Sequence, residues 1–191
     1  MIHQTISIGN FTFYQMSLND LRMIETKIHV DHRGNNVETY NQEIFQKGGI
    51  AAEFVQDNQS LSKKGVLRGL HFQRNYPQGK LVRVLLGEAY DVAVDLRKDS
   101  STYGKWEGVF LSEENRRMLY IPEGFAHGVL ALTEVTLFTY KCTDFRFPED
   151  EDGIMYNDPS LGIQWPTEKV DSIILSDRDQ KLTSFHAYDH L

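Results

Sequence analysis

The chain has 191 residues, 40% of them hydrophobic, which is enough for the core of one domain and too much for a disordered chain. Its formal net charge of −7 argues against general nucleic-acid binding, because that function needs a basic surface, but a few arginines in one cleft would still attract a small anion. No apolar run is long enough to cross a bilayer.

The first residues and the cysteine content indicate a cytoplasmic protein. Residues 1–5 lack the charged and apolar regions of a secretory signal. Cys142 is the only cysteine, so no intrachain disulfide can form, which agrees with a reducing compartment. We expect a single domain over residues 1–191, with a loose tail at residues 180–191.

The expected elements are mostly short strands. In chain order, the first is a short helix at residues 41–47, and alternating apolar and polar residues dominate from about Phe54 onward. The alternation is that of half-buried strands and is clearest at residues 90–96. The expected strands are residues 66–73, 80–86, 90–96, 106–111, 118–121, 128–132 and 136–143. Turn signals such as Gly87-Glu88 separate them, and a second helix is expected to begin at Ser176. This pattern predicts a mainly β sandwich or barrel.

Two of these strands carry side chains suited to proton transfer. His71 lies on the strand at residues 66–73, and histidine titrates near neutral pH. Tyr140 lies on the strand at residues 136–143, on the same face as Phe138 and Cys142. On this evidence alone a structural histidine and a core tyrosine with a satisfied hydroxyl remain the simpler interpretations.

Lys80 and Asp179 also admit two interpretations. Lys80 begins a strand, where a solvated lysine is the usual finding. Asp179 ends the sequence Ser-Asp-Arg-Asp at residues 176–179, which is also a helix capping box with Ser176 as its N-cap. Sequence alone favours the cap for Asp179.

Metal binding is not expected. Residues 122–127, Pro-Glu-Gly-Phe-Ala-His, resemble the second metal-binding motif of the cupin barrels. The first motif of that superfamily has two histidines one residue apart, but here Gln73 stands where the partner of His71 would be. One or two histidines without a carboxylate make a poor site for iron, zinc or manganese. We therefore predict no metal.

Several segments, taken together and in order, resemble the dTDP-4-dehydrorhamnose 3,5-epimerase family. They are VQDN at 55–58, VLRGLHFQ at 66–73, QGKLVR at 78–83, DVAVDLR at 91–97, IPEGFAHG at 121–128, YK at 140–141 and ND at 157–158. The resemblance extends from about residue 31 to residue 179, in the family's order and spacing. One such motif would be weak evidence, whereas the ordered set is specific.

The resemblance implies a fold and an activity. The fold would be an antiparallel double-stranded β-helix, the cupin jelly roll, with a few short helices, and the protein would be a homodimer without a metal or other cofactor. The substrate would be the nucleotide sugar dTDP-4-dehydro-6-deoxyglucose, inverted at C3 and C5 to give dTDP-4-dehydrorhamnose for surface polysaccharide. Neither nucleic acid nor membrane is an expected partner.

The resemblance also assigns roles residue by residue. His71 is similar to the general base, Asp179 to its carboxylate partner, Tyr140 to the acid on the opposite sugar face, and Lys80 to the group beside the ketone oxygen. The residues at positions that resemble nucleotide-sugar contacts are Arg33, Glu38, Gln56, Asn58, Arg68, His127, Asp152 and Arg178.

Three features depart from the family pattern or fit it awkwardly. Residues 35–37, Asn-Asn-Val, replace the usual aromatics before Glu38, and Arg146 aligns with the tyrosine that stacks on thymine. Because an arginine plane also stacks on a base, Arg146 is a candidate substrate contact, and Phe145 beside it is another. Strict alternation puts Arg68 and His71 on opposite faces, so both reach one ligand only if a bulge lies at Gly69.

The sequence is also compatible with other functions. The chain could invert one carbon only, or act on a different nucleotide-linked 4-keto sugar. It could also be a non-catalytic cupin that binds sugar, although the joint presence of the four proton-transfer residues argues against this. A metal-dependent cupin oxygenase is disfavoured by Gln73.

Overall fold

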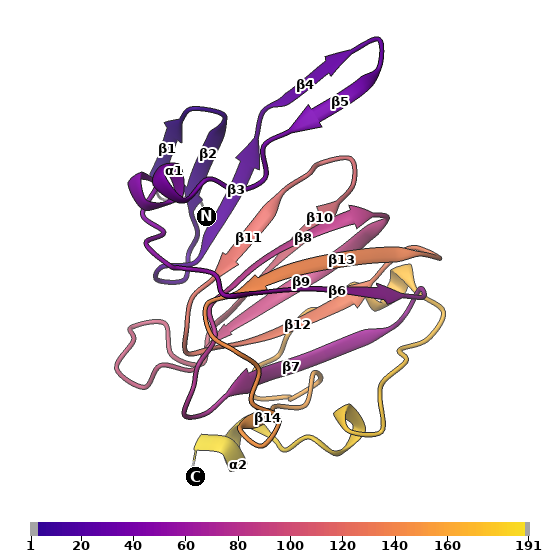
Figure 1. The fold of residues 1–191 in the computed structure, drawn as a ribbon. Helices are drawn as coiled ribbons and strands as arrows, with labels where there is room; N and C mark the ends of the chain where they lie inside the picture. The colour runs from indigo at the N-terminus through magenta and orange to yellow at the C-terminus, as the bar shows by residue number, and fades with distance from the viewer. Residues whose placement is uncertain (1–3, 190–191) are drawn as a thin grey trace.

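The described part of the chain, residues 4–189 of a computed structural model, forms two facing antiparallel sheets (Figure 1). One sheet contains, in spatial order, β1 (Gln4–Ile8), β2 (Phe11–Gln15), β3 (Arg22–Thr26), β11 (Met118–Ile121), β8 (Lys80–Leu86), β13 (Thr136–Cys142) and β6 (Gln56–Ser62). The other contains β10 (Trp106–Ser112), β9 (Glu88–Asp95), β12 (Phe125–Ala131), β7 (Leu67–Gln73) and β14 (Glu151–Gly153). The predicted mainly β, antiparallel fold is confirmed.

The main core lies between the two sheets. It is built from the inward-facing residues of both, among them Val82 and Phe138 from one sheet and Ala93 and Val129 from the other. A second core lies on the outer face of the five-stranded sheet, where Trp165 packs among residues of β7, β9 and β12. This second core makes β9 buried on both faces, so the prediction of a half-buried strand at residues 90–96 is wrong.

The N-terminal part contains strands that the sequence pattern did not predict. β1, β2 and β3 extend the large sheet, and β4 (Ile28–Asp31) with β5 (Gly34–Val37) forms a separate two-stranded hairpin that projects from the body (Figure 1). The helix predicted at residues 41–47 is present as α1 (Gln42–Lys47), and the Asn41 side chain accepts a hydrogen bond from the Ile44 amide as its N-cap.

The C-terminal segment is attached to the body. The Phe72 and Tyr188 rings pack edge to face with centroids 5.1 Å apart, and the Met155 amide donates to the Thr183 carbonyl at 2.9 Å. The helix α2 (Phe185–Asp189) ends the described chain. The expected loose tail is therefore wrong as far as residue 189, because aromatic contacts and backbone hydrogen bonds fix it; residues 190–191 of that prediction lie outside the described part.

Short 3-10 turns complete the list of elements. η1 (Thr167–Lys169) and η2 (Asp179–Lys181) lie in the long C-terminal connection. The second helix predicted from Ser176 is thus a single 3-10 turn that begins at Asp179. Among residues 4–189, no helix has the length and apolar character that a membrane span requires.

Candidate active site

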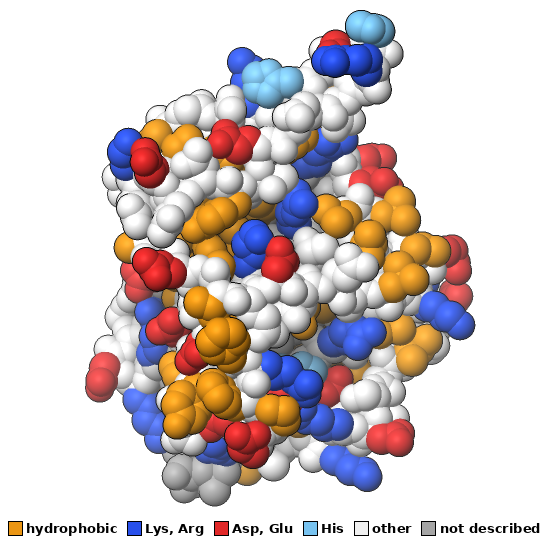
Figure 2. Space-filling model, in the orientation of Figure 1, with side chains coloured by type: hydrophobic (Ala, Val, Ile, Leu, Met, Phe, Trp, Pro, Cys, Tyr) orange, Lys and Arg blue, Asp and Glu red, His pale blue; other side chains and the backbone are white. Residues whose placement is uncertain are grey.

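A cavity of about 650 Å³ opens between the two sheets. Figure 2 shows a hollow in this face with a histidine at its floor and Lys or Arg side chains at its rim. Ten of the thirteen side chains predicted for the site line this cavity: Gln56, Asn58, Arg68, His71, Lys80, His127, Tyr140, Arg146, Arg178 and Asp179. A volume of this size suits a small organic ligand.

His71 on β7 is paired with Asp179. Its Nε2 lies 2.6 Å from Asp179 Oδ1, and the Asp179 side chain is 4% exposed. Burial alone would raise the pKa of Asp179, but hydrogen bonds from the His71 ring, the Gly69 amide and Ser176 outweigh it and hold the pKa below its usual value. Because Nε2 faces this carboxylate, Nδ1 is the ring nitrogen left for other chemistry.

The capping-box interpretation of residues 176–179 is half right. The Asp179 amide donates to Ser176 Oγ at 3.1 Å, as a cap predicts. The Asp179 carboxylate, however, accepts from His71 and not from the Ser176 amide, which a capping box would require. A charge-assisted bond to an imidazole is stronger than a bond to one more backbone amide, which explains why the side chain turns inward.

Lys80 and Tyr140 lie on neighbouring strands of the opposite wall. Burial lowers the pKa of Lys80, while nearby Cys142, Glu151 and Asp91 partly restore it. Burial also raises the pKa of Tyr140, so its hydroxyl stays protonated at neutral pH. The cavity therefore has an imidazole on one wall and a phenol with a lysine on the other.

A second histidine–carboxylate pair adjoins the cavity: His127 lines it, and Asp91, which the sequence pattern did not single out, is buried and does not. His127 Nε2 is 2.8 Å from Asp91 Oδ2, and the Asp91 side chain is fully buried. The other oxygen, Asp91 Oδ1, has no hydrogen-bond partner among the described residues. Alternation on residues 90–96 predicts that Asp91 faces solvent. Because the strand is in fact buried on both faces, Asp91 was not recognised as a partner of His127.

The rim of the cavity carries a cluster of two arginines that share one glutamate. Arg146 donates from Nε to Glu151 Oε1 at 2.8 Å and from Nη2 to Glu151 Oε2 at 3.0 Å, and Arg178 donates from Nη1 to the same Oε2 at 2.6 Å. The pair with Arg146, followed by burial and the bond from Arg178, sets the pKa of Glu151, which is lowered to about 2. Glu151 therefore stays ionised and holds both guanidinium groups.

Asp152, predicted as a ligand contact, lies outside the cavity lining, and its role as a contact stays a prediction. Its carboxylate instead accepts from Arg74 Nε at 2.6 Å. Successive residues of a strand point to opposite faces, and on β14 it is Glu151 that faces the cavity. The sequence has four acidic residues in a row at 149–152 and gives no signal for choosing among them without the strand orientation.

The bulge expected at Gly69 is confirmed. Arg68 pairs with Val129 and His71 with His127, so β7 has two residues where β12 has one. A Cβ on Gly69 would lie 2.5 Å from the Gly128 Cα, and the Gly69 φ is +131°. The extra residue brings Arg68 and His71 to the same cavity.

Comparison with known proteins identifies the family. A family model described as dTDP-4-dehydrorhamnose 3,5-epimerase matches residues 15–187. The chain belongs to this family. A dTDP-4-dehydrorhamnose 3,5-epimerase of Methanothermobacter thermautotrophicus is 55% identical over 173 residues, which is 91% of this chain and 94% of the relative.

Solved structures of epimerases support the same family assignment. The structure of a dTDP-6-deoxy-D-glucose-3,5-epimerase from Legionella pneumophila, in complex with dTDP-4-keto-L-rhamnose, aligns with a TM-score of 0.90 at 45% identity and covers 94% of this chain and 95% of that one. A 3'-monoepimerase from Streptomyces bikiniensis, in complex with dTDP-quinovose, gives 0.84 at 32% identity, with 92% and 88% covered. The cupin fold expected from the resemblance is confirmed.

Two of the predicted epimerase contacts lie away from the cavity. Arg33, at the tip of the β4–β5 hairpin, pairs with Asp31 at 2.6 Å, and Glu38 accepts from Asn10 and Asn41. Neither side chain lines the cavity of its own chain. Within one copy of the epimerase, these residues do not join the site.

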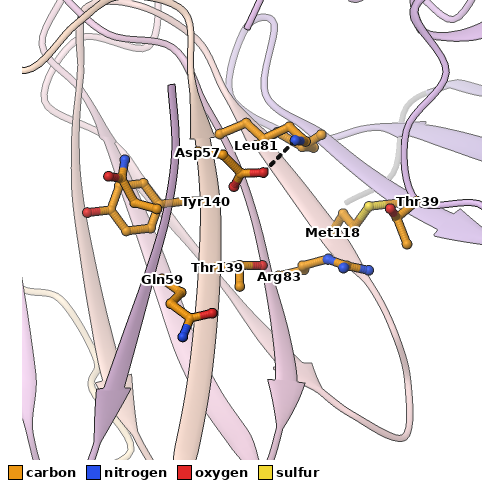
Figure 3. Close-up of a pocket in the computed structure, with 10 residues that line it drawn as sticks. Thr39, Asp57, Gln59, Leu81, Arg83, Met118, Thr139 and Tyr140 are labelled. Carbon is orange, nitrogen blue, oxygen red and sulfur yellow. Dashed lines mark hydrogen bonds and ion pairs between the residues drawn. The ribbon is translucent and has the colours of Figure 1, made fainter. Parts of the chain in front are cut away.

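A smaller hollow of about 310 Å³ lies on the other side of the large sheet (Figure 3). Figure 3 shows Arg83 on the opposite side of β13 from the Tyr140 ring. The hollow also contains an ion pair between Asp57 and Lys141, whose charged atoms are 2.7 Å apart. Of the proton-transfer set only Tyr140 contributes to this hollow; His71, Lys80 and Asp179 do not line it.

The described residues offer no ready metal site. Within residues 4–189, no three His, Cys, Asp or Glu side chains gather closely enough to hold an ion. The prediction that the reaction needs no metal stays a prediction.

Proposed function

We propose that this epimerase inverts C3 and C5 of dTDP-4-dehydro-6-deoxyglucose to give dTDP-4-dehydrorhamnose, for the synthesis of dTDP-rhamnose. The observation that carries the proposal is the placement of a carboxylate-backed imidazole, His71, and a protonated phenol, Tyr140, on one cavity. The relatives are named for the same reaction. The single cysteine cannot form an intrachain disulfide, which agrees with a function in the reducing cytoplasm.

In the first step His71 Nδ1 takes the proton from C3 or C5. Both carbons flank the C4 ketone, so the electron pair of the broken C–H bond moves to the ketone oxygen as an enolate. Asp179 keeps the ring in the tautomer with Nε2 protonated and stabilises the imidazolium that forms, in the way that the aspartate of a hydrolase triad does. The pairing thus holds the imidazole in an orientation that leaves Nδ1 for the substrate.

Lys80 stabilises the enolate oxygen. Its ammonium group has no acidic ion-pair partner among the described residues, so its charge is available to the substrate. Electrostatic stabilisation strengthens as water is excluded, and the partly buried position of Lys80 favours it. His127 also lines the cavity, and because its Nε2 donates to Asp91, its Nδ1 is left to accept a hydrogen bond from the substrate.

Tyr140 completes the inversion by giving a proton to the other face of the carbon. Its raised pKa keeps the phenol protonated before the transfer. After the step His71 releases its proton to solvent and Tyr140 takes one up, so the overall reaction gains and loses one proton at each carbon. Donor and acceptor on opposite walls give inversion, whereas return of the proton by His71 would give exchange with retention.

We also propose that the enzyme works as a homodimer in which the hairpin of one copy completes the cavity of the other. Support comes from Arg33 and Glu38, which resemble ligand contacts but lie outside their own cavity, and from the exposed Val30 on the projecting hairpin, which is 76% exposed. Mixing inactive Arg33→Ala with inactive His71→Ala should restore activity, because hybrid dimers contain one intact site. Mixtures as inactive as their components would oppose the shared site.

The reaction is tested by incubating the wild-type protein with dTDP-4-dehydro-6-deoxyglucose in deuterated buffer and analysing the product by NMR. The proposal predicts deuterium at C3 and C5 and the L-rhamno configuration. The relative described as a 3'-monoepimerase makes the alternative concrete. A product inverted at C3 only would assign that activity, and a substrate left without deuterium would identify a binding protein.

A further inference from the structure

Gln73 ends β7 and stands where the cupin motif would have its second histidine. The residue is 5% exposed, and it does not line the cavity. Its Nε2 donates to the Tyr76 carbonyl at 2.6 Å and to the Phe145 carbonyl at 3.2 Å, and its Oε1 accepts from the Phe147 amide at 2.8 Å. Both donors of the side-chain amide are therefore used, together with its acceptor oxygen.

These three bonds join two loops. One loop, residues 74–79, leads from β7 to β8, and the other, residues 143–150, leads from β13 to β14. Nearer to the strands, Gln78 Nε2 donates to the Asp144 carbonyl at 2.8 Å. The two loops are thus one hydrogen-bonded unit, and Gln73 lies in its interior.

The joined loops form part of the cavity rim. Gln78 from the first loop and Arg146 from the second both line the cavity. Because neither loop is part of a strand, the separation between these two side chains depends on loop hydrogen bonds such as those of Gln73. Without the amide, three backbone groups would lose their partners beside a buried side chain, which is unfavourable. The bonds of Gln73 therefore hold the two loops at a fixed separation.

The proton-transfer residues are held in a different way. Lys80 is paired within its sheet with Ile121 on β11 and with Cys142 on β13. His71 is paired with His127 on β12. Loosening the two loops should therefore change the fit of a ligand at the rim more than it changes the geometry of proton transfer.

Resting on the proposed function, we propose that Gln73 is a positioning residue that sets the width of the cavity rim, and with it the affinity for the nucleotide sugar, by tying the two loops together. A substitution at Gln73 should then raise KM and leave kcat almost unchanged. Loss of stability alone would have the opposite signature, because a smaller folded fraction lowers the apparent kcat and leaves KM as it is.

The experiment measures the affinity for dTDP by titration calorimetry, and kcat and KM for solvent deuterium incorporation into the substrate. Gln73→Met keeps the length of the side chain and removes its three hydrogen bonds. It should weaken dTDP about tenfold and raise KM about tenfold, with kcat within about twofold of wild type. Gln73→Glu keeps the bond from the Phe147 amide and loses both donated bonds, so it should change both constants in the same direction and replaces Gln73→Met if that variant does not fold.

Asp158→Asn is the matched control. Asp158 is also buried, at 2% exposed, and accepts from the Ser160 and Phe185 amides of two segments outside the cavity. It should lower thermal stability without changing the dTDP affinity or KM.

An unchanged dTDP affinity in a folded Gln73 variant, or a fall in kcat as large as the rise in KM, would overturn the proposal. Wild-type protein that binds no dTDP would also overturn it. If wild-type protein binds dTDP but exchanges no substrate proton, the proposed function fails, and the dTDP affinities alone then decide the role of Gln73.

Discussion

The carboxylate behind His71 should control the rate of proton abstraction. In Asp179→Asn the imidazolium faces a neutral amide in place of a carboxylate whose oxygen lies 2.6 Å from Nε2, in a site where the aspartate is almost fully buried. Removing one partner of a buried charged pair costs about 3–5 kcal/mol. If the transition state bears most of that cost, kcat/KM falls roughly a hundredfold to a few thousandfold.

The assay is the initial rate of solvent deuterium incorporation into dTDP-4-dehydro-6-deoxyglucose, followed by NMR. Asp177→Asn is the matched control, because it makes the same chemical change two residues away on an exposed side chain and should leave the rate unchanged. Thermal unfolding of both variants checks that each is folded. An Asp179→Asn rate within about threefold of wild type, in a folded protein, would refute the role of Asp179.

Further predictions concern the rest of the site and its frame. Asp91→Asn should lower kcat/KM about tenfold, because it removes the charge that orients His127; an unchanged rate would contradict this. The pKa of Glu151 falls from 4.5 to about 2 on folding, so its carboxylate stabilises the fold fully above about pH 4.5 and loses that effect as the pH falls towards 2. Because its arginine partners are half exposed, Glu151→Gln should cost about 1–2 kcal/mol in denaturant unfolding at pH 7 and almost nothing near pH 2; a gap that does not shrink would oppose the assignment. Gly69→Ala should cost about 2–4 kcal/mol because its Cβ would meet the β12 backbone, and Gly34→Ala, at positive φ but in open space, should cost less; equal losses would contradict the packing argument.

Much of the sheet follows from residue alternation. The strands at residues 80–86 and 118–121 have the bounds that the pattern predicted, and the others agree within about three residues. Alternation failed at β6, Gln56–Ser62, whose polar sequence has little strand preference of its own. Hydrogen bonding to β13 along its full length makes it a strand. Pairing between distant segments of this kind leaves no local signal.

The site was predictable where chemistry singles out a residue type, and less so where orientation decides. His71, Tyr140, Lys80 and Asp179 meet at one cavity as the resemblance implied. Asp91 was missed because burial of both faces of β9 depends on the C-terminal segment that covers the outer face. Because this covering arises only in the folded chain, the local sequence predicts that an aspartate in an alternating strand faces solvent.

The role of a proton acceptor and a proton donor on opposite walls is tested most directly by NMR of His71→Ala and Tyr140→Phe products formed in deuterated buffer. His71→Ala should give no deuterium at C3 or C5. Tyr140→Phe should still incorporate deuterium but lose inversion to a greater extent, at least at C5. Wild-type exchange by His71→Ala, or complete inversion by Tyr140→Phe, would contradict it.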